Sequence, residues 1–152
     1  MNAGDGIGEH PTQALLDVFT IYDELNMSES GARPLVVVLL GDLQHGRTVH
    51  SLAKLLAVSQ LWKDRLVLRY CAPQGLEMPS YITDFCASVP NVEQQVYTDP
   101  NEACKDADVL YVTRVQKERF ESAEDYEALK VSFHSPMFEC FNSCHSVDNI
   151  FV

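Results

Sequence analysis

Two arginines follow apolar runs of the kind that form buried strands. Arg47 comes a short polar loop after residues 35–40, and Arg114 comes almost directly after residues 108–112. Open α/β sheets bind ligands at the carboxyl ends of their strands, so each loop would bring one guanidinium group to that edge. Two such groups suit a small anion, most naturally a carboxylate held by paired hydrogen bonds. The alternative is that both arginines form surface ion pairs, and the residues alone leave both interpretations open.

His10 and Gln13 lie three residues apart at the start of a predicted helix, so their side chains face the same way. The start of a helix offers free N–H groups and a partial positive charge, which suit an anion or a carbonyl oxygen. A capping or surface histidine is the simpler interpretation of His10, and spacing alone favours it. Cys140, Cys144 and His145 are three potential metal ligands, but no second group of Cys or His residues nearby would complete a zinc site. We therefore predict no metal site.

The composition limits the classes of protein to consider. The chain has 152 residues, enough for one domain or a piece of a larger one. Its 11 Lys and Arg against 22 Asp and Glu give a net charge of -11, which argues against binding to nucleic acid or to an anionic membrane. Five cysteines at irregular spacing suit a reducing compartment, and we predict a cytoplasmic protein.

Helical and strand-like segments alternate along the chain. The first helix begins at Pro11 and carries an apolar stripe that we expect to be buried: Leu15, Val18, Phe19, Tyr22 and Leu25. The predicted strands are 35–40, 66–71, 92–96 and 108–112, and the later predicted helices are 47–61, one from 79, one from 99, and 117–130. This alternation predicts an α/β fold, a three-layer parallel sheet flanked by helices. Residues 131–152 show no clean periodicity and are either a poorly ordered tail or an unusual terminal element.

Three segments resemble the motifs of a known family, in order along the chain. They resemble the linker-helix motif and two later signatures of the aspartate carbamoyltransferases. Their sequences are most similar to those of the aspartate carbamoyltransferase in the animal multifunctional pyrimidine-synthesis protein. The segments are 2–17, with His10-Pro11-Thr12-Gln13, then 41–52, with Gly46-Arg47-Thr48-Val49-His50, and 108–120, with Thr113-Arg114-Val115-Gln116.

The resemblance implies a fold, a reaction and a domain organisation. The fold would be the Rossmann-like aspartate-binding domain of the carbamoyltransferases, here incomplete. The reaction would transfer the carbamoyl group of carbamoyl phosphate to the amino group of L-aspartate, without a metal, another cofactor or a covalent enzyme intermediate. Residues 1–26 would form the interdomain linker helix, 27–130 a truncated aspartate/ornithine-binding domain, and 131–152 a divergent tail.

The resemblance also implies roles for single residues. His10 would donate a hydrogen bond to the carbamoyl oxygen, and Gln13 would hold the carbamoyl amide.

The aspartate end would belong to the two later motifs. Arg47 and Arg114 would bind the carboxylates of aspartate, with Gln116 assisting Arg114 and Thr48 nearby. The sister family, which acts on ornithine, should lack these two motifs because its substrate is cationic at the far end.

The chain departs from the family pattern at both ends. We find no Ser-Thr-Arg-Thr phosphate motif, and after Lys130 no loop of the family's His-Pro-Leu/Met-Pro-Arg type. The full-length family enzyme is expected to be a homotrimer. Two hypotheses follow: a fragment of an active carbamoyltransferase, or a catalytically inert aspartate-binding module, which we expect of the isolated chain because the phosphate-binding half is missing.

Overall fold

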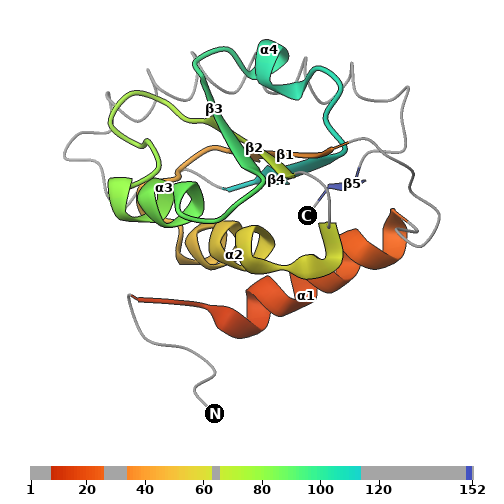
Figure 1. Cartoon of the computed structure of the whole chain (residues 1–152). Coiled ribbons are helices and arrows are strands. Elements are labelled where there is room, and N and C mark those ends of the chain that lie inside the picture. The colour runs from red at the N-terminus through yellow and green to blue at the C-terminus, as the bar shows by residue number, and fades with distance from the viewer. Residues whose placement is uncertain (1–7, 26–33, 63–65, 114–149, 152) are drawn as a thin grey trace.

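A parallel β-sheet lies at the centre of the molecule (Figure 1). The structure is a computed structural model that describes residues 8–25, 34–62, 66–113 and 150–151. Neighbouring strands are parallel throughout, in the order β3-β2-β1-β4-β5. The strands are β1 (Leu35–Leu40), β2 (Leu66–Cys71), β3 (Val92–Tyr97), β4 (Val109–Val112) and β5 (Ile150–Phe151).

The central strand β1 explains the two-sided core. Its six residues are all apolar, as expected for a strand covered on both faces. Successive side chains point to opposite faces, so Val37 and Leu39 belong to the larger apolar cluster and Val38 and Leu40 to the smaller one. The sheet is therefore packed on both sides, as the α/β prediction requires.

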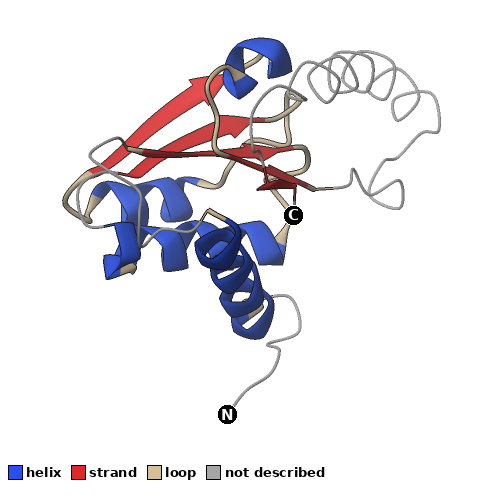
Figure 2. Ribbon diagram, turned by 90° about the vertical axis from the view of Figure 1, so that its right-hand side faces the viewer, coloured by secondary structure: helices blue, strands red, loops and turns tan. Residues whose placement is uncertain are grey.

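Among the described residues, three helices cover one face of the sheet and a short one covers the other (Figures 1 and 2). The larger face carries α1 (Pro11–Glu24), α2 (Arg47–Val58) and α3 (Ser80–Ala87), and the opposite face carries α4 (Pro100–Cys104). A 3-10 turn, η1 (Gln60–Trp62), follows α2, which is why α2 ends before the predicted limit at residue 61.

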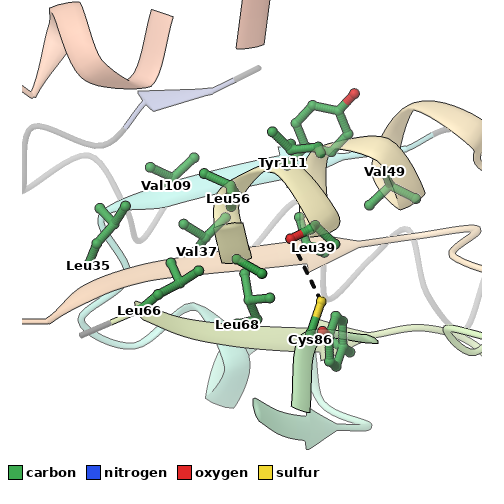
Figure 3. Close-up of a cluster of buried hydrophobic side chains, with 14 of the residues drawn as sticks. Leu35, Val37, Leu39, Val49, Leu56, Leu66, Leu68, Cys86, Val109 and Tyr111 are labelled. Atoms are coloured by element: carbon green, nitrogen blue, oxygen red, sulfur yellow. Dashed lines mark hydrogen bonds between the residues drawn. The ribbon is translucent and has the colours of Figure 1, made fainter. Parts of the chain in front are cut away.

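The larger core lies between the sheet and its three helices (Figure 3). Strand residues such as Leu68 and Val109 meet Val49 and Leu56 of α2 there, and all four are almost fully buried. The Cys86 thiol donates a hydrogen bond to the Ala53 carbonyl at 3.7 Å, which joins α3 to α2.

The predicted buried stripe of α1 is wrong in part. Leu15 and Phe19 are 59% and 65% exposed. The helix buries a neighbouring face against α2 instead, made of Ala14, Asp17, Val18 and Ile21. Both faces of α1 are largely apolar, so periodicity did not indicate which face is buried. The acidic Asp17 on the buried face made the other face the more plausible candidate for burial.

The chain end contributes a strand to the sheet. Ile150 and Phe151 pair with Val109 and Leu110 of β4, so this part of the predicted tail is an unusual terminal element. The predicted helix 117–130 and residues 131–149 lie outside the described residues. Cys71 and Cys86 are free thiols while Cys104 is disulfide-bonded, which departs from the expectation of reduced cysteines. No helix among the described residues is long and apolar enough to cross a membrane.

Candidate functional site

The loops that follow β1 and β4 are joined at one edge of the sheet. The Thr113 N–H donates to the Leu40 carbonyl at 2.8 Å, and its hydroxyl lies 3.2 Å from both the Leu40 and Asp42 carbonyl oxygens. Gly41 has a φ of +114°, and a Cβ atom there would lie 2.1 Å from the Thr113 carbonyl oxygen. The loop that precedes Arg47 and the residue that precedes Arg114 are thus in direct contact.

Arg47 is the first residue of α2 and is half-buried. Within the part of the chain that the structure describes, its guanidinium group forms no ion pair or hydrogen bond. The surface ion pair that was the alternative for this residue is therefore not seen among those residues. A guanidinium without a partner in that part of the chain, beside the positive end of a helix, suits an anionic ligand. Arg114 and Gln116 lie outside the described residues.

His10 caps the start of α1. Its Nδ1 atom accepts a hydrogen bond from the Gln13 N–H at 3.3 Å. His10 is therefore a helix-capping residue, as its simpler interpretation proposed. A ring nitrogen that accepts carries no proton, so the neutral ring carries its hydrogen on Nε2. Nε2 has no hydrogen-bond partner among the residues the structure describes, which leaves a ring donor for a ligand oxygen.

A chain of polar contacts fixes His10 to α2. The His10 N–H donates to the Ser51 hydroxyl at 2.9 Å, and that hydroxyl donates to the Glu9 carboxylate. The Lys54 ammonium donates to Glu9 Oε1 at 2.6 Å. Burial favours the neutral acid, but the hydrogen bonds from Lys54 and Ser51 outweigh it and lower the pKa of Glu9. The start of α1 is therefore held in a fixed position.

A buried carboxylate lies one helical turn after Gln13. The Gln13 Nε2 atom donates to Asp17 Oδ1 at 2.7 Å, and Asp17 is only 2% exposed. Burial raises the pKa of Tyr111 on β4 to about 12; a hydrogen bond with Thr48 lowers that pKa, and the Asp17 carboxylate adds to the rise. Asp17 and Tyr111 thus connect Gln13 on α1 with Thr48 on α2. Neither residue was predicted from the sequence; an acid four residues after Gln13 was the available signal for Asp17, and Tyr111 had none.

Polar side chains also hold the loop that leads into α2. The buried Asp42 accepts hydrogen bonds from the His45 N–H at 3.0 Å and from the His45 ring at 3.1 Å. His50 Nε2 lies 2.7 Å from the Leu43 carbonyl oxygen, and its Nδ1 lies 3.3 Å from the Tyr81 hydroxyl. Burial lowers the pKa of His50, so the neutral ring that donates to Leu43 is favoured.

No group of three or more His, Cys, Asp or Glu side chains among the described residues could hold a metal ion. Cys140, Cys144 and His145 lie outside those residues, so the absence of a metal and of any other cofactor stays a prediction.

Comparison with known proteins gives a consistent set of relatives. A family model described as "Aspartate/ornithine carbamoyltransferase, Asp/Orn binding domain" matches residues 34–135. The multifunctional protein CAD of Squalus acanthias is 52% identical over 128 residues, which are 84% of this chain and 5% of that protein.

Two solved structures agree in fold. The catalytic subunit of M. jannaschii aspartate transcarbamoylase has a TM-score of 0.78 and 32% identity, over 99% of this chain and 45% of that one. Aspartate transcarbamoylase from Trypanosoma cruzi, in complex with carbamoyl phosphate and aspartate, has a TM-score of 0.68 and 33% identity, over 89% and 39% of the two chains. This chain therefore spans less than half the length of each of these three relatives.

The matched region includes the whole described sheet apart from β5, together with α2 and the loops that follow β1 and β4. The sequence motifs and the fold lead to the same assignment. The chain belongs to the aspartate/ornithine carbamoyltransferase family and contains its Asp/Orn binding domain.

Proposed function

We propose that this chain is the aspartate-binding part of an aspartate carbamoyltransferase. One observation carries the proposal: the half-buried Arg47 guanidinium forms no bond within the described residues, and it follows a loop that contacts the residue before Arg114. The substrates would be L-aspartate and carbamoyl phosphate, the two ligands named for the Trypanosoma cruzi relative. The resemblance of this chain's motifs to those of the animal multifunctional pyrimidine-synthesis protein implies a role in pyrimidine synthesis.

In the proposed site, the aspartate end is bound by cations. Arg47 and Arg114 would each form paired hydrogen bonds with one carboxylate of aspartate, Gln116 would assist Arg114, and Thr48 would lie beside them. Planar guanidinium groups match carboxylates in both charge and geometry. The same pair of charges would repel a substrate with a cationic side chain.

The carbamoyl end is bound by α1 in this proposal. The amino nitrogen of aspartate attacks the carbonyl carbon of carbamoyl phosphate, and the oxygen of that carbonyl takes up negative charge. The carbonyl then re-forms as the C–O bond to phosphate breaks, phosphate leaves with the bonding electrons, and the leaving phosphate accepts the proton that the nitrogen loses. The His10 Nε2–H would donate to the oxygen, Gln13 would bind the carbamoyl amide, and a fixed donor of this kind stabilises the charge that develops.

The wider organisation is part of the proposal. Residues 1–26 would be the linker helix, 27–130 the aspartate-binding domain and 131–152 a divergent tail, in a cytoplasmic protein whose full-length form is a homotrimer. The contact of α1 with α2 supports a linker fixed to the domain.

A second candidate function is an inert module that binds aspartate without turnover. This chain spans less than half of the two solved structures named above, and its 152 residues contain no Ser-Thr-Arg-Thr motif. Incubation of the chain with carbamoyl phosphate and labelled L-aspartate separates the two, because labelled N-carbamoyl-L-aspartate forms only if the chain is active.

The binding proposal is tested by titration of the chain with L-aspartate, followed by NMR. Arg47→Ala should weaken binding about tenfold or more, because a charge-assisted bond contributes about 1.5–3 kcal/mol, and Arg47→Lys should restore part of the loss. Lys105→Ala is the matched control, since Lys105 pairs with Glu102 beside α4, on the far face. Equal binding by all variants, or tighter binding of ornithine than of aspartate, would contradict the proposal.

A further inference from the structure

Asp17 is an unusual residue for the buried face of a helix. Its carboxylate is 2% exposed, it accepts a hydrogen bond from Gln13 Nε2 at 2.7 Å, and it also interacts with the Tyr111 hydroxyl. The other oxygen, Oδ2, is buried without such a partner in the same part of the chain. A buried polar atom without a partner costs stability, so packing alone does not explain this side chain.

The carboxylate determines which end of the Gln13 side chain remains available. An ionised carboxylate only accepts hydrogen bonds, whereas an amide has a donor end and an acceptor end. Because Asp17 binds the NH₂ end of Gln13, the Oε1 atom is left as the free end. Asp17 lies four residues after Gln13, in the geometry that brings two helix side chains together.

His10 supplies the complementary group on the same helix turn. Its Nδ1 accepts from the Gln13 N–H, so its Nε2 is the donor in the neutral ring. One donor and one acceptor, three residues apart, match the two ends of a carboxamide, which has an acceptor oxygen and a donor NH₂. They do not match a carboxylate, whose two oxygens both accept.

We propose that Asp17 is a positioning residue that orients the Gln13 amide and thereby makes this end of the site select a carboxamide over a carboxylate. The inference rests on the proposed function and deepens it, since it assigns the carbamoyl group to a donor–acceptor pair whose polarity Asp17 sets. In Asp17→Asn the new side chain can donate, the Gln13 amide can turn over, and the selection is lost.

The orientation is tested first, without any ligand. The side-chain NH₂ signals of ¹⁵N-labelled protein are recorded by NMR. The two proton signals of the Gln13 NH₂ group are identified because they disappear in Gln13→Met. We expect these protons to exchange slowly with water and to move in Asp17→Asn, but not in the control Asp23→Asn, which changes an exposed acid on the same helix. A Gln13 signal in the unmutated chain that matches a solvent-exposed glutamine would overturn the inference, even if Asp17→Asn fails to fold.

The selectivity is tested with two stable probes of the same size. Phosphonoacetamide carries the carboxamide and phosphonoacetate the carboxylate, and their dissociation constants are compared by NMR titration. The unmutated chain should prefer the amide, and Asp17→Asn should shift the ratio at least fivefold toward the carboxylate. A purely structural role would weaken both probes equally, and that result would contradict the proposal.

A double-mutant cycle links the effect to Gln13. With Met at position 13, Asp17→Asn should no longer change the ratio, because the amide that it orients is gone. A ratio that still changes would overturn the positioning role while leaving the proposed function intact. A failure of the unmutated chain to bind either probe, with normal aspartate binding, would refute the selectivity but not the aspartate site.

Discussion

Ser51 connects the two helices of the candidate site through a single hydroxyl group. It accepts a hydrogen bond from the His10 N–H and donates one to the Glu9 carboxylate, which also binds Lys54. The position of the His10 ring therefore depends on a residue of α2 that need not touch a ligand. Such supporting contacts decide how accurately a site is held.

Ser51→Ala should lower the free energy of unfolding by about 1–3 kcal/mol, because it leaves the His10 N–H and a Glu9 oxygen without their partner. Urea unfolding followed by circular dichroism measures the change. Ser88→Ala is the control, since that exposed hydroxyl bonds the Phe85 carbonyl and no other described residue, and its loss should change stability by no more than about 0.5 kcal/mol. Equal losses in the two variants would show that the contact is unimportant.

At the scale of residues, the motifs identified His10, Gln13, Arg47 and Thr48, and the structure describes all four. It also connects Gln13 to Thr48 through Asp17 and Tyr111, and of these two only Asp17, four residues after Gln13, had a local signal. Such partners come from α1, α2 and β4, and they meet only after the chain has folded. Spacing along one helix can identify a pair such as His10 and Gln13, but not a contact between elements.

The loops after β1 and β4 form one unit at the scale of elements. Gly41 permits this because its backbone adopts a positive φ while the Thr113 carbonyl lies against its Cα. A side chain at this position would separate two loops that each lead into a candidate arginine.

Gly41→Ala should destabilise the protein by about 3 kcal/mol or more, since backbone strain adds to a steric clash. Gly75→Ala is a matched control, because Gly75 also has a positive φ, of +84°, but has open space where a Cβ would lie. It should cost only about 1–2 kcal/mol. Thermal unfolding of both variants makes the comparison, and a Gly41→Ala protein as stable as Gly75→Ala would refute the close approach.

How far each element could be predicted depended on how one-sided its pattern was. The strands 35–40 and 66–71 were predicted with their observed limits, because each is a short, largely apolar run between polar segments. The orientation of α1 was not, because this helix has two apolar faces and buries an acid. The strand β5 was also missed, since two residues carry no periodicity.

The molecule as a whole buries several groups that ionise only at high pH. Burial raises the pKa of the Cys71 thiol to about 12 and that of Tyr111 to about 12, and it also raises the pKa of Tyr70. In the unfolded chain these groups would lose their protons near their ordinary pKa values, about 9–10. Between about pH 9 and pH 12 the folded protein therefore binds more protons than the unfolded one.

The free energy of unfolding should accordingly be fully retained below about pH 9 and fall as the pH rises toward 12, by about 1.4 kcal/mol per pH unit for each such group. Urea midpoints over this range measure the slope. Tyr111→Phe should make it shallower above about pH 10, whereas Tyr22→Phe, on the exposed face of α1, should not. A stability that stays constant to pH 12 would contradict the assignment.

The hydrogen bond from the Val36 N–H to Asp108 Oδ2, at 2.8 Å, joins residues 72 positions apart. It lies where the central strand β1 meets β4. Of the two strands beside β1, β4 is therefore synthesised much later than β2. Contacts between such distant segments slow folding, because a long loop must close before they form. A nascent chain can complete β1 with β2 early, but the edge that carries the candidate site assembles only after β4 has left the ribosome.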